Sequence, residues 1–434
     1  MAASRDHIVT LESMQPALTE ALEAQTAPDR QTRADTRLTV ARYYQILNRL
    51  RHETDVNGPD VMVTVPDREV SLAQSKLASD GAAGRALPSG GQEVKFGTGL
   101  AGGDWFGWLR SLIDWVDRRD AHSLMRPTTI DAAPLPESAR IALASDWGTG
   151  LYGAPKISDT IRRLSHDRKF DLLMHLGDIY YSGTKDEVQE RFLDVWPSDA
   201  ATISRALNAN HEMYSGGFGY FQLALPALGQ QSSYFAFRNT HWLVVGLDTA
   251  YVDHDIDTEQ VAWLNLVIND ALADEDNPRK VLLFSHQQPF SRLNSQGPKL
   301  QQALGHLLSS RAITAWYWGH EHACVLYDQH PQWGLFGRCL GNGGIPSVRE
   351  AEVKNAPDDA AQPGAARCTW KRLAATPDSP GCLVLDGPNM DLANASDQQK
   401  FGPHGFMTLE LDGDQLVERV LLSDGTQLLE HVIQ

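Results

Sequence analysis

The chain has few cysteines, and their positions exclude two classes of small structural domain. Only four occur among 434 residues. They are Cys324, Cys339, Cys368 and Cys382, and none forms a CxxC pair. A disulfide framework and a zinc ribbon are therefore both poor interpretations.

Long apolar segments are also missing. The first residues contain no apolar stretch of the kind found in signal peptides. No apolar run approaches the roughly 20 residues that a transmembrane helix needs. The expected location is therefore cytoplasmic, with export by a route that uses no signal peptide left open.

Positive charge is scarce relative to negative charge. Lys and Arg number 38 against 55 Asp and Glu, which gives a formal net charge of −17. Such a charge repels a phosphate backbone, so we expect no partnership with long nucleic acids. The 11 Trp, 11 Tyr and 13 Phe indicate substantial cores and exclude disorder of the whole chain. Bound metal ions could still create a local cationic site.

The composition divides the chain into three parts. Residues 1–78 are expected to be helical, with an apolar face over 38–50. A Gly-rich linker and a Trp-rich amphipathic helix fill 79–136, and the mixed charges of that helix favour packing on the main domain over membrane binding. The main domain is expected over 137–434. The partner and the role of the N-terminal part stay open.

Strands and helices alternate in the main domain, which predicts an α/β fold. Buried strands are expected at 141–145, 172–176, 242–247, 281–284 and 314–318, and helices near 155–169, 258–274 and 298–311. The end of the chain has two hairpin turns, at Asp412-Gly413 and Asp424-Gly425. A segment at about 346–404 is rich in Pro, Ala and Asp, and is expected to be an extended loop insertion.

Polar side chains follow several of the predicted strands. The carboxyl ends of parallel strands meet at one edge of a sheet, so residues distant in sequence can converge there. The residues concerned are Asp146, Asp178, Tyr181, Asn210, His211, Glu212, His286, His320 and His322.

These side chains offer the donors of a dinuclear metal centre. Carboxylate and amide oxygens, imidazole nitrogens and a phenol suit hard divalent or trivalent ions. Two metals about 3.5–4 Å apart can clamp a phosphoryl group and activate water. One carboxylate must then bridge them, and Asp178 is the natural bridge.

The order of these motifs resembles the calcineurin-like metallophosphoesterases, and in particular their purple-acid-phosphatase branch. That branch reads D-x-G, G-D-x-x-Y, G-N-H-E, a lone H and G-H-x-H, and the resemblance covers about residues 138–345. It implies a four-layer α/β/β/α sandwich of two mixed sheets flanked by helices, here with a helical N-terminal extension.

The branch is indicated by two positions, one that has lost a ligand histidine and one that supplies a tyrosine in its place. Many metallophosphoesterases have D-x-H, but Gly148 stands at the His position, and Tyr181 supplies the tyrosine of the branch. A phenol has a pKa near 10, and Fe(III) strongly favours its deprotonation. The pattern therefore suggests two metal ions, Fe(III) beside a divalent Fe, Zn or Mn.

The resemblance also implies a role for each residue. The first metal would be held by Asp146, Asp178, Tyr181 and His322, and the second by Asp178, Asn210, His286 and His320. His211 would contact the phosphate and help to protonate the leaving group, and Glu212 would orient His211.

Two features of the sequence concern the loop that carries Asn210, and a third is a separate candidate site. Ala209 replaces the glycine of G-N-H-E, and the stretch 202–207 is less strand-like than expected. Asp253-His254-Asp255 could be an extra metal or substrate site, but is expected to be a charged loop.

The implied reaction is hydrolysis of phosphate monoesters by a metal-bound hydroxide, with catalysis by His211, Asp178 and Asn210 and with a small phosphorylated substrate. One alternative is a phosphodiesterase acting on cyclic or short nucleotides. Another is a metal-binding scaffold whose N-terminal region binds a partner, although a degenerate scaffold would be expected to lose at least one ligand.

Overall fold

The structure, a computed structural model, describes residues 121–433 except 149, 180–181, 200, 253, 275, 295–296, 363 and 366. The predicted helices over 38–50 and 104–119 lie outside the described residues. So does Tyr181. The three-part division of the chain therefore stays a prediction.

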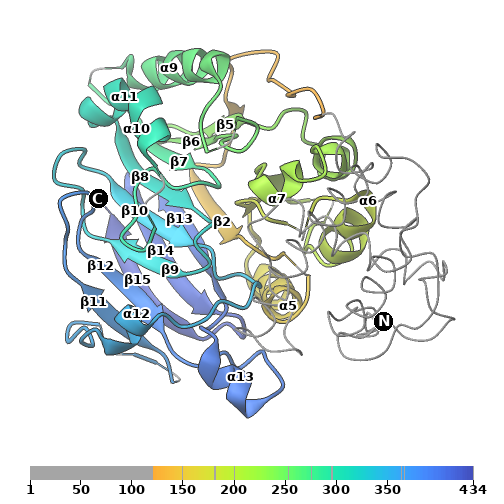
Figure 1. Cartoon of the computed structure of the whole chain (residues 1–434). Coiled ribbons are helices and arrows are strands. Elements are labelled where there is room, and N and C mark those ends of the chain that lie inside the picture. Colours follow the sequence, from red (N-terminus) through yellow and green to blue (C-terminus); the bar gives the residue numbers. More distant parts are fainter. Residues whose placement is uncertain are drawn as a thin grey trace, which may run out of the picture. The chain divides into compact units, whose positions relative to one another are not determined.

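Two mixed sheets form the centre of the described domain (Figure 1). The larger has nine strands in the order β1-β5-β6-β7-β8-β10-β9-β12-β11. Its strands are β1 (Ala133–Pro134), β5 (Phe235–Arg238), β6 (Trp242–Gly246), β7 (Lys280–Phe284), β8 (Ile313–Trp318), β9 (Cys324–Tyr327), β10 (Phe336–Leu340), β11 (Thr369–Leu373) and β12 (Cys382–Asp386).

The smaller sheet has six strands in the order β15-β14-β13-β2-β3-β4. Its strands are β2 (Ser138–Ala144), β3 (Leu172–His175), β4 (Ile203–Ala206), β13 (Gly405–Asp412), β14 (Gln415–Leu422) and β15 (Gln427–Ile433). In each sheet a run of neighbouring strands is parallel: β2, β3 and β4 here, and β6, β7, β8 and β10 in the larger sheet. Those parallel runs set the edge where the polar side chains converge.

Helices cover the outer faces of both sheets. The longer helices are α5 (Gly153–Asp167) and α9 (Thr258–Leu272). The shorter helices are α6 (Lys185–Glu187), α7 (Asn210–Met213), α8 (Leu225–Ala227), α10 (Pro298–Ala303), α11 (Gly305–Ser309), α12 (Ala351–Asn355) and α13 (Ala395–Lys400), with short π-helical segments at Val188–Leu193 and Tyr220–Ala224.

Three apolar clusters hold the layers together. The central cluster joins the facing sides of the two sheets, with Met174 and Phe284 among its members. A second packs α9, α10 and α11 on the nine-stranded sheet, and a third packs α5 on the six-stranded sheet. Burial of apolar area drives this arrangement. The described domain is therefore the predicted four-layer α/β/β/α sandwich.

The alternating pattern of the sequence locates the central elements well. Each of the five expected strands is present, and the end of the chain turns at Asp412-Gly413 and Asp424-Gly425 between β13, β14 and β15. The weakly strand-like stretch 202–207 does contain a strand, β4, paired in parallel with β3.

The segment 346–404 differs from the loop expected from its Pro, Ala and Asp content. It contains α12, α13, β11 and β12. The last two extend the nine-stranded sheet beyond β9. Elements this short show little hydrophobic periodicity in the sequence. Whether they form strands depends on pairing with a neighbouring strand, which the local sequence does not reveal.

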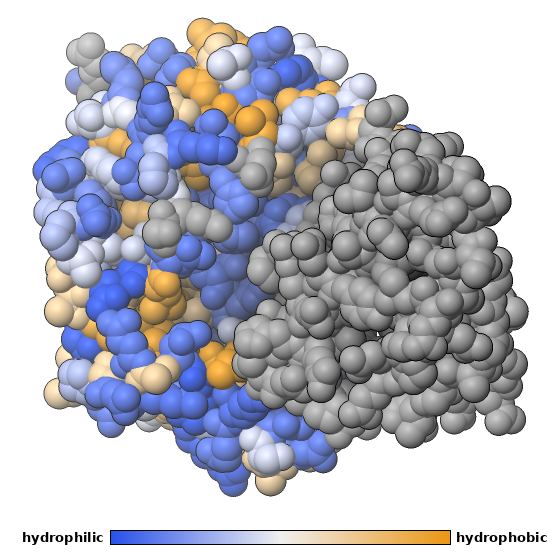
Figure 2. All heavy atoms as spheres, in the orientation of Figure 1, coloured by the Kyte–Doolittle hydropathy of each residue, from blue (hydrophilic) through white to orange (hydrophobic). Residues whose placement is uncertain are grey.

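The visible surface of this domain is largely hydrophilic, with hydrophobic side chains in small separate groups (Figure 2). Among the described residues, no helix is long and apolar enough to cross a membrane.

Candidate metal centre

Five loops bring the candidate site residues together. Asp146 follows β2, Asp178 follows β3, Asn210 and His211 follow β4, His286 follows β7, and His320 and His322 follow β8. All five strands belong to the parallel parts of the two sheets, so their carboxyl ends meet at one edge.

Two groups of ligand atoms share one carboxylate. Asp178, His286 and His320 form one group, and Asp146, Asp178 and His322 form the other. Within each group the candidate ligand atoms all lie within 4.8 Å of one another. Asp178 is common to both groups, which is the geometry that a bridging ligand requires.

The group around His286 is compact. His286 Nε2 lies 3.3 Å from Asp178 Oδ2 and 3.1 Å from Asn210 Oδ1. His320 Nδ1 lies 3.2 Å from the same Nε2 atom. His286 Nδ1 faces the carbonyl oxygen of Leu176 at 3.0 Å, so the N–H of a neutral ring donates there and Nε2 is left as a ligand.

The group around Asp146 is held mainly by backbone. His322 Nε2 lies 3.4 Å from Asp146 Oδ1. The backbone N–H of His320 lies 3.1 Å from both Asp146 carboxylate oxygens, and the Ser145 hydroxyl donates to Oδ2. Tyr181, the fourth ligand implied for this group, lies outside the described residues.

Four of the candidate ligands have a strained backbone conformation that orients their side chains. Asp146, Asp178, His320 and His322 have positive φ angles of 54°, 52°, 70° and 47°. Residues other than glycine adopt this region at a cost, and such strain clusters at functional sites. A Cβ on Gly319 would collide with the side chains of Ser145 and Asp146, which is why the loop before His320 needs glycine.

His211 lies beside the ligand groups. Its Nε2 atom is 3.9 Å from Asp178 Oδ2, and its backbone N–H donates to Asp178 Oδ1 at 3.3 Å. The side chain is only 3% exposed. Ala209, one residue before Asn210, does not adopt positive φ, so its replacement of glycine brings no backbone strain.

Glu212 contacts the loop that carries Asp178. Its Oε1 accepts the backbone N–H of Ile179 at 3.0 Å. Burial and the nearby Asp178 carboxylate raise the pKa of Glu212 well above its usual value. The contact with Ile179 ties α7 to the end of β3, so Glu212 helps to hold the loops together.

The ionisation of the cluster reflects its burial. Burial, with a further contribution from Asp178, raises the pKa of Asp146 to about 8. Burial opposes the charged form of His286, but the carboxylates of Asp178 and Asp146 outweigh it and raise its pKa to about 9. Burial lowers the pKa of His322 to about 4. Asp146 therefore has too little positive charge around it, whereas His286 and His211 outweigh burial and hold the pKa of Asp178 well below its ordinary value.

A cation would correct this imbalance. Asp178 Oδ2 is buried and no described residue donates a hydrogen bond to it. Bound metal requires ionised carboxylates and neutral imidazoles, and it compensates that orphaned oxygen. The donor set of oxygens and imidazole nitrogens thus fits hard divalent or trivalent ions.

Two further side chains, which the sequence did not assign to the site, contact a candidate ligand or the loop that carries one. His254, expected in a charged loop, has its ring against that of His320, with centroids 5.2 Å apart. Asp248 follows β6 and accepts hydrogen bonds from Asn208 at 3.1 and 3.2 Å. The rule that polar residues after buried strands converge could have found Asp248, whereas nothing local indicates that His254 meets His320.

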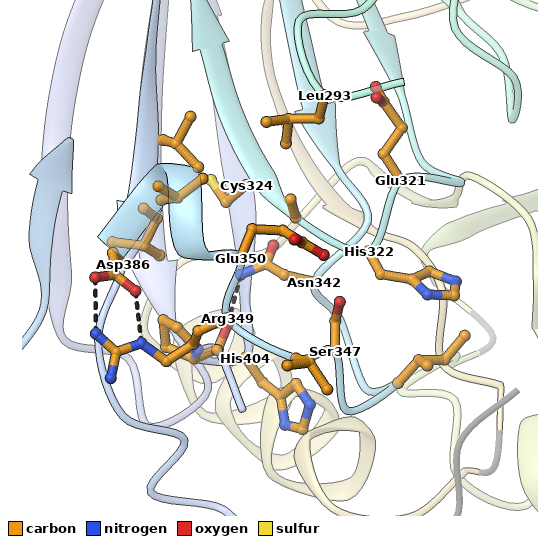
Figure 3. A pocket seen from close by; sticks show the side chains of 18 of the residues that line it. Leu293, Glu321, His322, Cys324, Asn342, Ser347, Arg349, Glu350, Asp386 and His404 are labelled. Atoms are coloured by element: carbon orange, nitrogen blue, oxygen red, sulfur yellow. Dashed lines mark hydrogen bonds and ion pairs between the residues drawn. The ribbon is translucent and has the colours of Figure 1, made fainter. Parts of the chain in front are cut away.

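A pocket of about 250 Å³ lies beside His322 (Figure 3). One side is formed by residues 321–324, which include His322. The remainder comes from residues 293–294, 342–353, 384–386 and 402–404. The pocket therefore joins the candidate metal centre to the segment that the sequence predicted to be a loop.

Comparison with known families and structures places this geometry in context. Residues 139–324 match a family described as Calcineurin-like phosphoesterase. The chain is similar in structure to a purple acid phosphatase from yellow lupin (Lupinus luteus) seeds, with 14% identity and a TM-score of 0.50. The match covers 71% of this chain but 55% of the lupin chain, so this chain spans about half of the lupin enzyme. At that identity the likeness shows a shared fold.

Two further structures match with lower scores. A dimetal phosphatase from Danio rerio is 15% identical over 68% of this chain and 98% of its own, with a TM-score of 0.41. GAP50, the anchor in the inner membrane complex of Plasmodium, is 13% identical over 68% of this chain and 89% of its own, with a TM-score of 0.45. The search of curated proteins finds no match.

Proposed function

The region 139–324 belongs to the calcineurin-like phosphoesterases, and from this premise we propose that the chain hydrolyses phosphate monoesters at a centre of two metal ions. The observation that carries the proposal is the position of Asp178. It belongs to both groups of candidate ligands, and its buried Oδ2 receives no hydrogen bond from the described residues.

The proposed ligands divide between the two ions. Asp146, Asp178, His322 and Tyr181 would hold the first, and Asp178, Asn210, His286 and His320 the second. When bound, the two ions would neutralise charge on the phosphoryl group and supply activated water. Positive φ at Asp146, Asp178, His320 and His322 supports this assignment, because strained ligand loops reduce reorganisation on metal binding.

The protein's own residues would position and protonate the substrate. His211 would donate a proton from its ring to the oxygen of the departing alcohol. Its Nε2, 3.9 Å from the shared Asp178 carboxylate, is close enough to the metal centre for that role. His286 would stay fixed by the Leu176 carbonyl, so that its Nε2 keeps facing the centre.

The purple-acid-phosphatase branch is part of the proposal. It is supported by Gly148 at the position where other families have a histidine, and by Tyr181 three residues after Asp178. A phenolate ligand favours Fe(III), so we propose Fe(III) beside a divalent Fe, Zn or Mn. That branch also supports a small phosphomonoester as substrate over a cyclic or short nucleotide diester.

Paired substrates test the proposal. The full chain, loaded with iron and zinc, is assayed on an activated aryl phosphate monoester and on the matching diester. A large monoester preference is expected. A diester preference would favour the nucleotide phosphodiesterase alternative, and absence of turnover with both metals bound would favour a scaffold.

A further inference from the structure

The pocket beside His322 is built mostly from residues beyond the family match, which ends at residue 324. Its walls therefore belong to this chain and not to the shared catalytic framework. Because His322 is one of its lining residues, a group bound there lies next to the candidate metal centre. This is where the alcohol part of a phosphate ester could extend.

Three groups with hydrogen-bond acceptors line the middle of the pocket. Figure 3 shows the side chains of Glu350, Ser347 and Asn342 grouped together in this view of the lining. Asn342 is 5% exposed, and its Nδ2 donates to the Pro403 carbonyl at 3.0 Å. Within the described part of the chain, nothing donates to Asn342 Oδ1, and nothing pairs with the Glu350 carboxylate.

The other charges of the pocket are already engaged. Arg349 forms two hydrogen bonds with Asp386, at 2.6 and 2.7 Å. Glu352 forms an ion pair with Arg292 at 2.5 Å. Arg349 is therefore not free to bind an anion, and the unpaired charge of the lining is negative.

The Glu321 carboxylate also has partners. Trp318 Nε1 donates to it at 2.9 Å, and the Ser291 hydroxyl donates to its other oxygen. The carboxylate points away from the pocket in Figure 3. Glu350 is thus the acidic group left to meet a ligand.

Apolar side chains complete the walls, so the pocket suits a hydrocarbon chain as well as a polar end. They are Leu293, Ile345, Val348, Val353, Val384 and Leu385. Covering such side chains with an alkyl group removes apolar area from water.

We propose that this pocket binds the alcohol part of the substrate, and that this part is an alkyl chain ending in a primary amine. The proposal rests on the proposed phosphomonoesterase function. An ammonium group has three donors, which match the acceptors of Glu350, Ser347 and Asn342. An alcohol carrying a carboxylate or a second phosphate would be repelled by Glu350.

Isosteric substrate pairs test this with the metal-loaded full chain. Phosphate esters of ω-amino alcohols with two to five carbons are compared with n-alkyl phosphates in which a methyl replaces the ammonium. At the optimal length, kcat/KM for the amine should exceed that for the alkyl ester by about tenfold, as expected for a charge-assisted hydrogen bond. Equal values at every length would overturn the proposal.

Two glutamine variants locate the effect. Glu350→Gln should reduce the preference for the amine over the alkyl ester to about twofold or less. Glu352→Gln is the matched control, because Glu352 lies in the same lining but its carboxylate already pairs with Arg292. It should leave the preference intact. Loss of the preference in the control and not in Glu350→Gln would contradict the assignment.

A binding measurement separates this proposal from the proposed function. Calorimetry compares ω-aminoalkylphosphonates with alkylphosphonates of equal length, which are not hydrolysed. Tighter binding of the amines, lost in Glu350→Gln, supports the pocket even if no ester is turned over. Turnover of the aryl phosphate without any preference for amines would leave the phosphatase function standing and overturn the pocket.

Discussion

The Glu418 cluster between the two sheets and the Asp178 cluster at the strand ends both bury carboxylates, but their charges are balanced differently. Glu418 is 1% exposed and accepts bonds from Arg338 at 3.0 and 3.1 Å and from the Tyr317 hydroxyl at 2.6 Å. His431 Nδ1 lies 3.0 Å away. Burial alone would raise its pKa, but Arg338 outweighs burial and lowers the pKa to about 2.

The Asp178 cluster has histidines in place of that arginine, and they lower the pKa of Asp178 but leave that of Asp146 raised. Asp178 Oδ2 receives no hydrogen bond from the described residues, and burial raises the pKa of Asp146 to about 8. Its loops also adopt positive φ, whereas Glu418 and Arg338 lie in regular strands. A buried polar cluster completed by the protein's own residues stabilises the fold, and an incomplete one on strained loops indicates a binding site.

The largest expected effect comes from removing the shared carboxylate. Asp178→Asn should abolish measurable turnover of the aryl phosphate and lower the content of both metals, because a neutral amide with one oxygen cannot bridge two cations as a carboxylate does. Metal analysis and activity check this. A chelator should lower the melting temperature of the wild type and change that of the variant much less. Full activity with normal metal content would exclude the bridging role.

His211→Ala separates a ligand from a neighbouring proton donor. We expect kcat to fall by about 10²–10⁴-fold with both metals retained, as is usual for loss of a general acid. Steady-state kinetics and metal analysis of the same preparation provide the check. Loss of a metal ion from the variant would show that His211 is a ligand.

Arg338→Met tests the complete cluster. It should lower the free energy of unfolding by about 3–5 kcal/mol, because Glu418 would be left as a buried unpaired charge. Denaturant unfolding measures this. Arg238→Met is the control, since the pair of Arg238 with Asp270 lies at the surface and should contribute at most about 1 kcal/mol. Equal losses of unfolding free energy in the two variants would show that the buried Glu418 cluster contributes no more to stability than a surface pair.

The pH dependence of stability should report the same carboxylate. The pKa of Glu418 is about 2 in the folded protein, below its ordinary value of 4.5. The unfolded chain therefore takes up the proton first as pH falls, and stability from this group is lost between pH 4.5 and 2. Unfolding of Glu418→Gln should show a flatter dependence over that window, and an identical slope would argue against the shift.

The smallest expected effect on turnover concerns Tyr181. If it ligates Fe(III), Tyr181→Phe should remove the visible charge-transfer absorption of the iron-loaded protein and change kcat only modestly. Absorption spectra of both proteins at equal iron content are the measurement. An unchanged spectrum would remove the main support for Fe(III).

Much of the fold could be predicted from local patterns. Alternating apolar strands and helical periodicity located the parallel strands β2, β3, β6, β7 and β8. Weak strands were missed where pairing, and not residue type, decides the conformation, as in β4 and in β11 and β12. The expected loop at 346–404 was therefore the main departure.

The candidate site divides in the same way. Asp146, Asp178, His286, His320 and His322 follow buried strands, so their convergence could be anticipated from order along the chain. The contact of His254 with His320 could not, because it depends on how the loop after β6 crosses the edge of the sheet. Nor could the pocket, whose lining comes from five separate stretches of sequence.

The sequence by itself determined which residues could bind metal and which strands would carry them, because residue chemistry and hydrophobic periodicity are local properties. Only the tertiary structure decided that the ligand atoms of each group, both of which include Asp178, lie within 4.8 Å of one another. It also decided that Asp178 Oδ2 receives no hydrogen bond from the described residues, and that Glu350 faces a pocket beside His322. Those facts depend on distances between segments far apart in the chain, which strand pairing and core packing set.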